Sequence, residues 1–212
     1  MRIGIIGTGN MAEALGTQWG RAGHDVLFGG RSPDRARALA GRTGQGAGTV
    51  TEAAAFGDAI LLALPYDAVA GVLGGLGAAD GALRDRLLID CTNAVGPGFR
   101  LTTDGGPGAA RTIADSTGAR VVKAFNHLPD SVWRLTPPAF ADGPVTVPLC
   151  GDDEQALEAV GVLVRALGCV PLTVGGLDRA GYLETTTAFL IGLWHRGHDP
   201  RTLLPPFHAA TA

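Results

Sequence analysis

The sequence predicts an α/β fold: a doubly wound parallel sheet with helices on both faces and a small C-terminal αβ extension. Short apolar runs alternate with segments of helical spacing over the first 126 residues, and this pattern indicates consecutive βαβ units. A glycine-rich turn, GTGNMA, joins the first apolar run to the first helical segment. Such a turn is typical of sheets that bind nucleotides at the start of a helix.

The elements of the first part of the chain follow in order from these patterns. Strands are expected over residues 2–7, 24–30, 59–65, 86–93 and 119–126, because continuous apolar runs suit strands that are buried on both faces. Helices are expected over residues 10–23, 32–44, 66–77 and 106–118. Ser32 followed by Pro33 is a typical helix start, and Gly23 is a typical helix end.

The rhythm changes after residue 127. The stretch HLPDSVWRLTPPAFADGP contains four prolines and predicts an extended connection. A strand over 145–153, an amphipathic helix over 153–168, a strand over 169–176 and a long helix over 177–197 follow, and the Pro-rich tail is expected to be irregular. We therefore expect a dinucleotide-binding domain over residues 1–127 and an extension over 128–212 that completes an acceptor pocket and a dimer interface.

Composition narrows the classes of function. The chain of 212 residues is 46% hydrophobic and 17% charged, with a net charge of -3, so it can bury a sizeable core and shows no preference for nucleic acid or an anionic membrane. No apolar run reaches the roughly 18 residues of a membrane span, and no signal-peptide pattern is present. The three separated cysteines predict buried thiols in a reducing cytoplasm rather than disulfides or a metal site.

The first turn predicts a phosphate-binding loop. Gly7 permits a tight turn, Gly9 lets backbone approach a pyrophosphate, and Ala12 lets the helix pack close to the strand. The helix N-terminus then offers N–H groups and partial positive charge to the phosphates. The alternative is a glycine turn with a purely structural role.

The end of the second strand indicates which dinucleotide is bound. An NAD-selective domain commonly has an acidic residue there to accept hydrogen bonds from the ribose hydroxyls, but no acid lies between Val26 and Pro33. Arg31, Ser32 and Arg35 stand there instead, and guanidinium groups bind phosphate with paired hydrogen bonds. The sequence therefore favours NADP(H) over NAD(H), unless both arginines are ordinary solvated surface residues.

The hydride acceptor is expected at the carboxyl edge of the sheet, where open α/β sheets bind ligands. The chain has no Tyr-x-x-x-Lys pair, no P-loop and no metal-binding histidine spacing. Asn126 and His127 follow a strand at this edge and are the candidate catalytic residues, with His127 as a candidate proton donor. Lys123, Asp90 and Tyr182 are further candidate proton donors, and Lys123 either pairs with Asp90 or reaches the surface.

Five segments together resemble the NADPH-dependent coenzyme F420 reductases, also called F420H2:NADP oxidoreductases. They are RIGIIGTGNMAEALGTQWGRAGHDVLFGGRSPDRA, LLALPYDAV, VVKAFNHLP, VTVPLCGDDEQA and LDRAGYLETTTAFLIGLW. The resemblance implies a Rossmann domain with a small αβ addition, usually in a homodimer. It also implies direct hydride transfer between the nicotinamide of NADP and the deazaflavin F420.

The resemblance also implies roles for single residues. Thr8, Asn10 and Met11 would contact the pyrophosphate, and Arg31 and Arg35 the 2′-phosphate. Leu64, Pro65 and Tyr66 would border the adenosine and nicotinamide side, and the segment AFNHLP would line the nicotinamide and acceptor pocket.

Two positions depart from the family pattern. Gly30 stands where the family often has a serine that touches the 2′-phosphate, with Ser32 as a candidate substitute. Asn126 stands where some members have a histidine, which here follows one position later as His127. The second departure bears on the acceptor, because this pocket is the one expected to contact it.

Three functions remain open from the sequence. The first is an NADP-dependent oxidoreductase with F420 as acceptor, and the second is an NADPH-dependent reductase of a small imine or carbonyl compound. The third is a sensor that binds NADPH without turnover. The helix expected over 177–197 is apolar almost all round, which predicts burial and, in so small a chain, a dimer interface.

Overall fold

The computed structural model describes residues 1–103, 105–141 and 143–203. One sheet of eight strands has the order β10-β9-β6-β5-β4-β1-β2-β3. Its strands are β1 (Arg2–Ile6), β2 (Asp25–Gly29), β3 (Gly46–Gly48), β4 (Ala59–Leu62), β5 (Leu87–Asp90), β6 (Arg120–Lys123), β9 (Thr146–Gly151) and β10 (Val170–Gly175). Strands β7 (Ala139–Phe140) and β8 (Gly143–Pro144) form a separate small hairpin.

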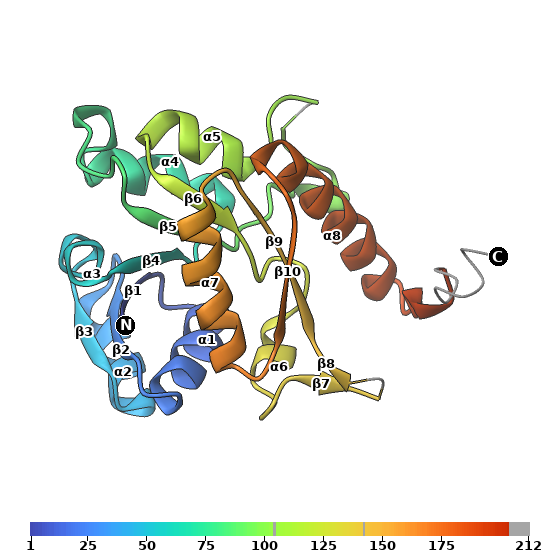
Figure 1. Ribbon diagram of the computed structural model, residues 1–212, viewed down its shortest axis with the longest axis horizontal. Coiled ribbons are helices and arrows are strands. Elements are labelled where there is room, and N and C mark those ends of the chain that lie inside the picture. Colours follow the sequence, from blue (N-terminus) through green and yellow to red (C-terminus); the bar gives the residue numbers. More distant parts are fainter. Residues whose placement is uncertain (104, 142, 204–212) are drawn as a thin grey trace.

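Helices cover both faces of the sheet, as expected of a doubly wound fold (Figure 1). The helices are α1 (Asn10–Arg21), α2 (Pro33–Thr43), α3 (Val50–Phe56), α4 (Tyr66–Gly75), α5 (Ala109–Thr117), α6 (Asp130–Trp133), α7 (Glu154–Ala166) and α8 (Ala180–His195). Short 3-10 helices span Ala78–Asp80, Pro97–Phe99, Leu177–Arg179 and Pro200–Leu203.

The two faces bury separate apolar clusters because side chains alternate along a strand. In β4, Ala59 and Leu61 pack in the cluster that contains α1 and α7 residues. Ile60 and Leu62 pack in the cluster that contains residues of α3, α4 and α5. Every residue of β4 is buried, which explains why the strand reads as a continuous apolar run.

The predicted C-terminal extension joins the parallel sheet through one antiparallel pair of strands. β9 pairs antiparallel to β6, through Val122 with Gly151 and Lys123 with Cys150. A parallel neighbour needs a crossover connection that returns to the starting edge, whereas the segment between β6 and β9 holds only the short α6 and the β7–β8 hairpin. β9, α7 and β10 then form a parallel βαβ unit that extends the same sheet.

Several elements lie where the sequence predicted none. The segment between α2 and β4 forms β3 and α3, and α6 lies within the expected extended connection. The Pro-rich tail forms a 3-10 helix over Pro200–Leu203, and the rest of that tail lies outside the described residues. These elements are too short to show a regular apolar pattern in the sequence.

The prediction that the last helix is buried is wrong for the single chain. Glu184, Thr187 and Ala188 of α8 are buried against the body, but Tyr182 is 66% exposed and Phe189 60% exposed. Figure 1 shows α8 running away from the sheet toward the C-terminus. The apolar character all around the helix therefore reflects one packed side and one exposed apolar side.

Candidate functional site

A cavity of about 420 Å³ lies at the carboxyl ends of β1, β2 and β4. The cavity gathers eight of the eleven residues predicted to bind the cofactor, from three separate segments. Its lining consists of Ile6, Gly7, Thr8, Gly9, Gly30, Arg31, Ser32, Arg35, Val50, Ala63, Leu64, Pro65 and Val72. The fold therefore brings the glycine loop, the arginines and the segment after β4 to one place.

The glycine loop has the geometry that a phosphate-binding turn requires. Gly7 adopts φ 136°, and a Cβ atom there would lie 2.1 Å from the Ala63 carbonyl oxygen, so a side chain does not fit. A Cβ atom at Gly9 would meet nothing within 4 Å, and no side chain caps the N-terminus of α1. The first N–H groups of α1 are thus open to an anion.

Arg31 and Arg35 provide positive charge at the rim of this cavity. Both residues are exposed, and within the described part of the chain neither guanidinium forms an ion pair. The nearby carboxylate of Asp34 is engaged by Arg37 instead, at 2.5 Å. A bound phosphate would therefore not have to displace an internal carboxylate from Arg31 or Arg35.

The Ser32 hydroxyl is partly engaged by its own helix. It accepts a hydrogen bond from the Arg35 N–H at 3.4 Å as the N-cap of α2. At Gly30, a Cβ atom would lie 2.8 Å from Thr8 Cγ2 and 3.5 Å from Thr8 Oγ1. The Thr8 side chain therefore occupies the space that a serine at position 30 would need, and it carries a hydroxyl into that space.

A second cavity, of about 500 Å³, lies beyond the carboxyl ends of β5 and β6. It is lined by Met11, Cys91, Asn93, Phe125, Asn126, His127, Leu128, Pro129, Asp130, Thr187, Ile191 and Trp194. Met11 lies two residues after Gly9 of the first cavity. The predicted acceptor residues Asn126 and His127 thus share a wall with side chains from α8.

Phe125 sets the direction of the chain at the start of this wall. It is a fully buried non-glycine residue with φ 63°, a conformation that bulky residues rarely adopt and that often marks a functional site. Its ring packs edge-on between Trp19, at 5.7 Å between ring centroids, and Trp133, at 5.5 Å. This packing holds the strained turn that places Asn126 and His127 at the cavity.

His127 is held in its neutral form. Burial lowers the pKa of its imidazole to about 4, although a hydrogen bond with the Thr146 backbone opposes the shift. The ring lies edge-on to Trp133 at 5.7 Å between centroids. At neutral pH this imidazole is therefore uncharged, which makes it a poor general acid.

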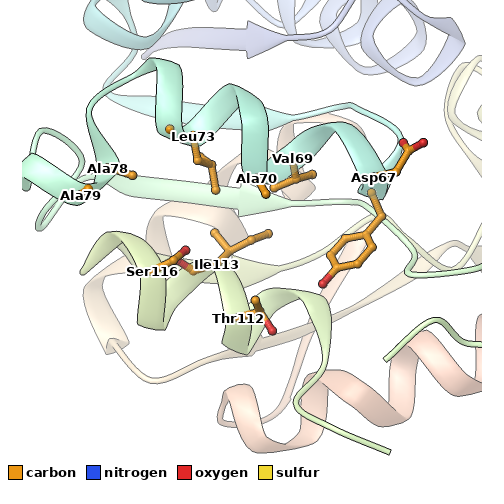
Figure 2. Close-up of a pocket in the computed structure, with 11 residues that line it drawn as sticks. Asp67, Val69, Ala70, Leu73, Ala78, Ala79, Thr112, Ile113 and Ser116 are labelled. Atoms are coloured by element: carbon orange, nitrogen blue, oxygen red, sulfur yellow. The ribbon is translucent and has the colours of Figure 1, made fainter. Parts of the chain in front are cut away.

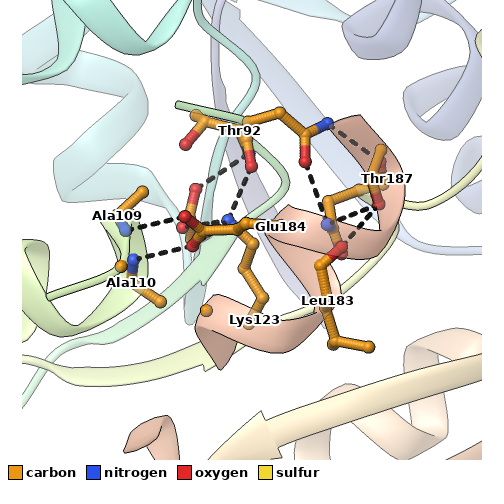
Figure 3. Close-up of polar contacts among 12 residues, drawn as sticks. Thr92, Ala109, Ala110, Lys123, Leu183, Glu184 and Thr187 are labelled. Carbon is orange, nitrogen blue, oxygen red and sulfur yellow. Dashed lines mark hydrogen bonds and ion pairs between the residues drawn. The ribbon is translucent and has the colours of Figure 1, made fainter. Parts of the chain in front are cut away.

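Lys123 and its partners form a buried ionic cluster that does not line the cavity (Figure 3). Its Nζ lies 2.9 Å from Asp90 Oδ2 and 2.9 Å from Glu184 Oε1, and all three side chains are almost completely buried. Glu184 also accepts a hydrogen bond from the Ala109 N–H at the start of α5, at 2.9 Å. Of the two interpretations left open for Lys123, pairing with Asp90 is correct.

Two predicted cofactor residues lie outside both cavities. Tyr66 lines a groove of about 440 Å³ between α4 and α5, where Leu73 and Ile113 face one another (Figure 2). Asn10 begins α1 beside the loop but lines neither cavity. Conversely, Cys91, Thr187 and Ile191 line the acceptor cavity without having been predicted; the threonines inside the apolar α8 sequence were the available signal.

The prediction of buried cysteine thiols agrees with the structure. Cys91, Cys150 and Cys169 are buried and unpaired, and burial raises the pKa of the Cys91 thiol to about 12. No cluster of metal-ligating side chains occurs within the described ranges. Over the same ranges, no helix combines the length and apolarity needed to span a bilayer.

Comparison with known proteins supports the resemblance read from the sequence. Residues 2–94 match the family described as NADP oxidoreductase, coenzyme F420-dependent. The F420-dependent NADP reductase of Methanothermobacter thermautotrophicus is 29% identical over 214 residues, which cover 91% of this chain and 89% of the relative. The resemblance read from the sequence is therefore confirmed, and it extends beyond the first domain.

Two further proteins are similar to this chain. Rat metalloreductase STEAP3 is 30% identical over 194 residues, which are 91% of this chain but 38% of STEAP3, so this chain spans well under half of that protein. The solved structure of a candidate F420-dependent NADP-reductase from Arthrobacter sp. FB24 has a TM-score of 0.82 at 22% identity. The aligned region covers 92% of this chain and 95% of that one, and it confirms the fold.

Proposed function

We propose that this protein transfers a hydride between NADP(H) and coenzyme F420. The observation that carries the proposal is the pair of cavities along the carboxyl edge of one sheet. The first contains a glycine loop and two arginines that form no ion pair with any described residue, and the second is largely apolar. When bound, NADPH supplies the hydride; with one proton from solvent, the oxidised deazaflavin becomes F420H2 and the other product is NADP+.

The chain's own residues have binding roles in this proposal. Arg31 and Arg35 hold the 2′-phosphate, with hydroxyl groups from Ser32 and Thr8 beside them. Gly7 and Gly9, with the open N-terminus of α1, hold the pyrophosphate. The apolar wall of the second cavity excludes water and stacks against flat rings, and proximity of two rings is the main requirement of hydride transfer.

The placement of the ionisable groups favours F420 over an imine or carbonyl acceptor. Those acceptors also need a proton from a positioned acid. Of the candidate acids, His127 is neutral with a pKa of about 4, and Lys123 and Asp90 are bound to each other inside the protein. Tyr182 is 66% exposed on α8 and does not line the second cavity.

The direct test is to follow NADPH absorbance after oxidised F420 is added to purified protein. Rapid NADPH oxidation that depends on F420 is the expected result. Oxidation with cyclic imines but not with F420 would favour the reductase of imines. NADPH binding without turnover in either case would favour the sensor.

We further propose that the protein forms a homodimer through α8. Tyr182 and Phe189 are 66% and 60% exposed and lie about two helical turns apart on the same side of α8. Exposed apolar side chains that lie together commonly mark protein interfaces. Light scattering should show a dimer for the unmodified protein and a monomer for Phe189→Glu. If the unmodified protein is monomeric at micromolar concentration, the proposed dimer is excluded.

A further inference from the structure

Glu184 is the residue through which α8 reaches the sheet. Its Oε1 lies 2.9 Å from Lys123 Nζ, and its Oε2 accepts a hydrogen bond from the Ala109 N–H at 2.9 Å. Oε1 also accepts from the Ala110 N–H at 3.4 Å. Figure 3 shows the carboxylate between Lys123 and these two residues at the start of α5. One side chain of α8 is therefore bound both to β6 and to α5.

Lys123 is fully engaged at the other end of this contact. Its ammonium group donates to Asp90 Oδ2 at 2.9 Å and to the Thr92 carbonyl oxygen at 2.6 Å, and Glu184 is its third partner. Three acceptors match the three hydrogens of an ammonium group. Burial alone would lower the pKa of Lys123, but the carboxylates of Asp90 and Glu184 outweigh burial and raise this pKa. The lysine therefore stays charged, and the ionic cluster is a fixed joint between the sheet and α8.

This joint lies between the two walls of the second cavity. One wall is formed by residues 125–130, which follow Lys123 shortly after the end of β6, and the other wall is formed by α8. The residues of the α8 wall are Thr187, Ile191 and Trp194. They stand at i+3, i+7 and i+10 from Glu184 and therefore lie on the same side of the helix as its carboxylate. A change in the contact between Glu184 and Lys123 thus shifts the whole α8 wall.

Within the described residues, α8 has few other attachments to the body of the protein. Its buried residues all lie before Phe189, and they are Ala180, Glu184, Thr187 and Ala188. Beyond them the helix runs away from the sheet (Figure 1), where the rings of Phe99 and His195 lie 5.1 Å apart between centroids. Hydrogen bonds between charged groups are about twice as strong as neutral ones. Glu184 is therefore the principal attachment of α8.

We propose that Glu184 is a positioning residue that sets the width of the second cavity through its ion pair with Lys123. The pair holds the α8 wall at a fixed distance from residues 125–130. A flat ring between the two walls gains dispersion contacts on both faces only when the walls fit its thickness. The proposal rests on the proposed function, in which the acceptor ring binds in this cavity.

Glu184→Gln tests this role because glutamine keeps the length and shape of the side chain. Its amide oxygen can still accept a hydrogen bond from the Ala109 N–H, but the negative charge that binds Lys123 is lost. We expect the helix to separate from β6 and the α8 wall to move outward. Glu158→Gln is the matched control, because it makes the same change in an exposed ion pair with Arg165 on α7, outside the second cavity.

The first measurement is the quenching of tryptophan fluorescence by acrylamide, which reports the position of α8 without any ligand. Trp19 and Trp133 are 0% exposed, whereas Trp194 in the α8 wall is 38% exposed, so quenching reports Trp194. Quenching should increase in Glu184→Gln, because the outward movement exposes more of this ring. It should stay unchanged in Glu158→Gln.

The second measurement separates KM for F420 from kcat in the oxidation of NADPH. A misplacement of about 1 Å costs about 100-fold in rate, so kcat/KM for F420 should fall by about this factor in Glu184→Gln, with a rise in KM. The dissociation constant of NADPH should change by less than about twofold, because its phosphates are proposed to bind in the first cavity. The control Glu158→Gln should leave all three constants unchanged.

A second variant covers the possibility that Glu184→Gln does not fold. Glu184→Asp keeps the charge on a side chain that is one methylene shorter, and it should show both changes to a smaller degree. Circular dichroism establishes that each variant is folded, and Glu184→Asp decides the result if Glu184→Gln is unfolded.

Three results would overturn the inference. Unchanged quenching in folded Glu184→Gln would show that the ion pair does not hold the α8 wall. A lower kcat with an unchanged KM for F420 would show a merely structural role, and an equal loss of NADPH affinity would show general damage to the site. If the unmodified protein does not oxidise NADPH with F420, the proposed function fails, while the quenching comparison still decides whether Glu184 positions α8.

Discussion

Replacement of Arg31 by alanine should reduce affinity for NADPH and leave affinity for NADH nearly unchanged. Arg31 lines the cavity beside the glycine loop, is exposed, and has no internal carboxylate partner within the described residues. Its removal therefore strands no buried charge and should not affect folding. A hydrogen bond from a charged group contributes about 1.5–3 kcal/mol, so the dissociation constant for NADPH should rise about 10- to 150-fold.

The assay is fluorescence titration of the reduced cofactors, with NADPH and NADH measured on the same preparations. Arg37→Ala is the matched control, because Arg37 lies in α2, shortly after Arg31 in the chain, is paired with Asp34 at 2.5 Å, and does not line the cavity. It should leave both affinities within about twofold, as surface substitutions usually do. Equal losses of NADPH and NADH affinity in Arg31→Ala would refute the assignment of Arg31 to the 2′-phosphate.

Three further predictions follow from the same structure. Thr8→Val should weaken NADPH binding about tenfold more than NADH binding, because the Thr8 hydroxyl lies 3.5 Å from where the Cβ atom of a residue-30 side chain would stand. Equal weakening would instead assign the hydroxyl to the pyrophosphate. Lys123→Met should lower the free energy of unfolding by about 3–5 kcal/mol in urea titrations, since it leaves two buried carboxylates without their cation. As a control, Arg111→Met breaks a surface ion pair with Asp152 at 2.9 Å and should lower the free energy of unfolding by about 0–1 kcal/mol. Similar losses of stability in Lys123→Met and Arg111→Met would contradict the role of burial. The unmodified protein should lose about 2 kcal/mol more stability than His127→Gln between pH 7.5 and pH 5. The pKa of His127 falls from 6.5 to about 4 on folding, so the unfolded state binds more protons in this interval; identical pH profiles would exclude this.

The long elements could be predicted from the sequence because each carries its own signal. β4 reads as a continuous apolar run since both its faces are buried, and α2 begins at Ser32 and Pro33 as its capping sequence indicates. The pair β3 and α3 was missed, although Thr49 and Glu52 form a capping box at the start of α3. β3 has three residues, two of them glycine, and α3 has seven residues. Segments this short contain too few apolar residues to show a strand or helix periodicity in the sequence.

The sequence by itself determined the sheet of βαβ units, the glycine loop and the positive charge after β2, because these depend on residues close together in the chain. Only the tertiary structure decided how distant segments meet. The antiparallel placement of β9, the burial of Lys123 between Asp90 and Glu184, and the threonine of α8 that fixes Asn126 all join residues from separate elements. Such contacts depend on packing across the sheet and have no local period in the sequence. For that reason the loop and arginines proposed to bind the cofactor could be anticipated, while the shape and polarity of the second cavity could not.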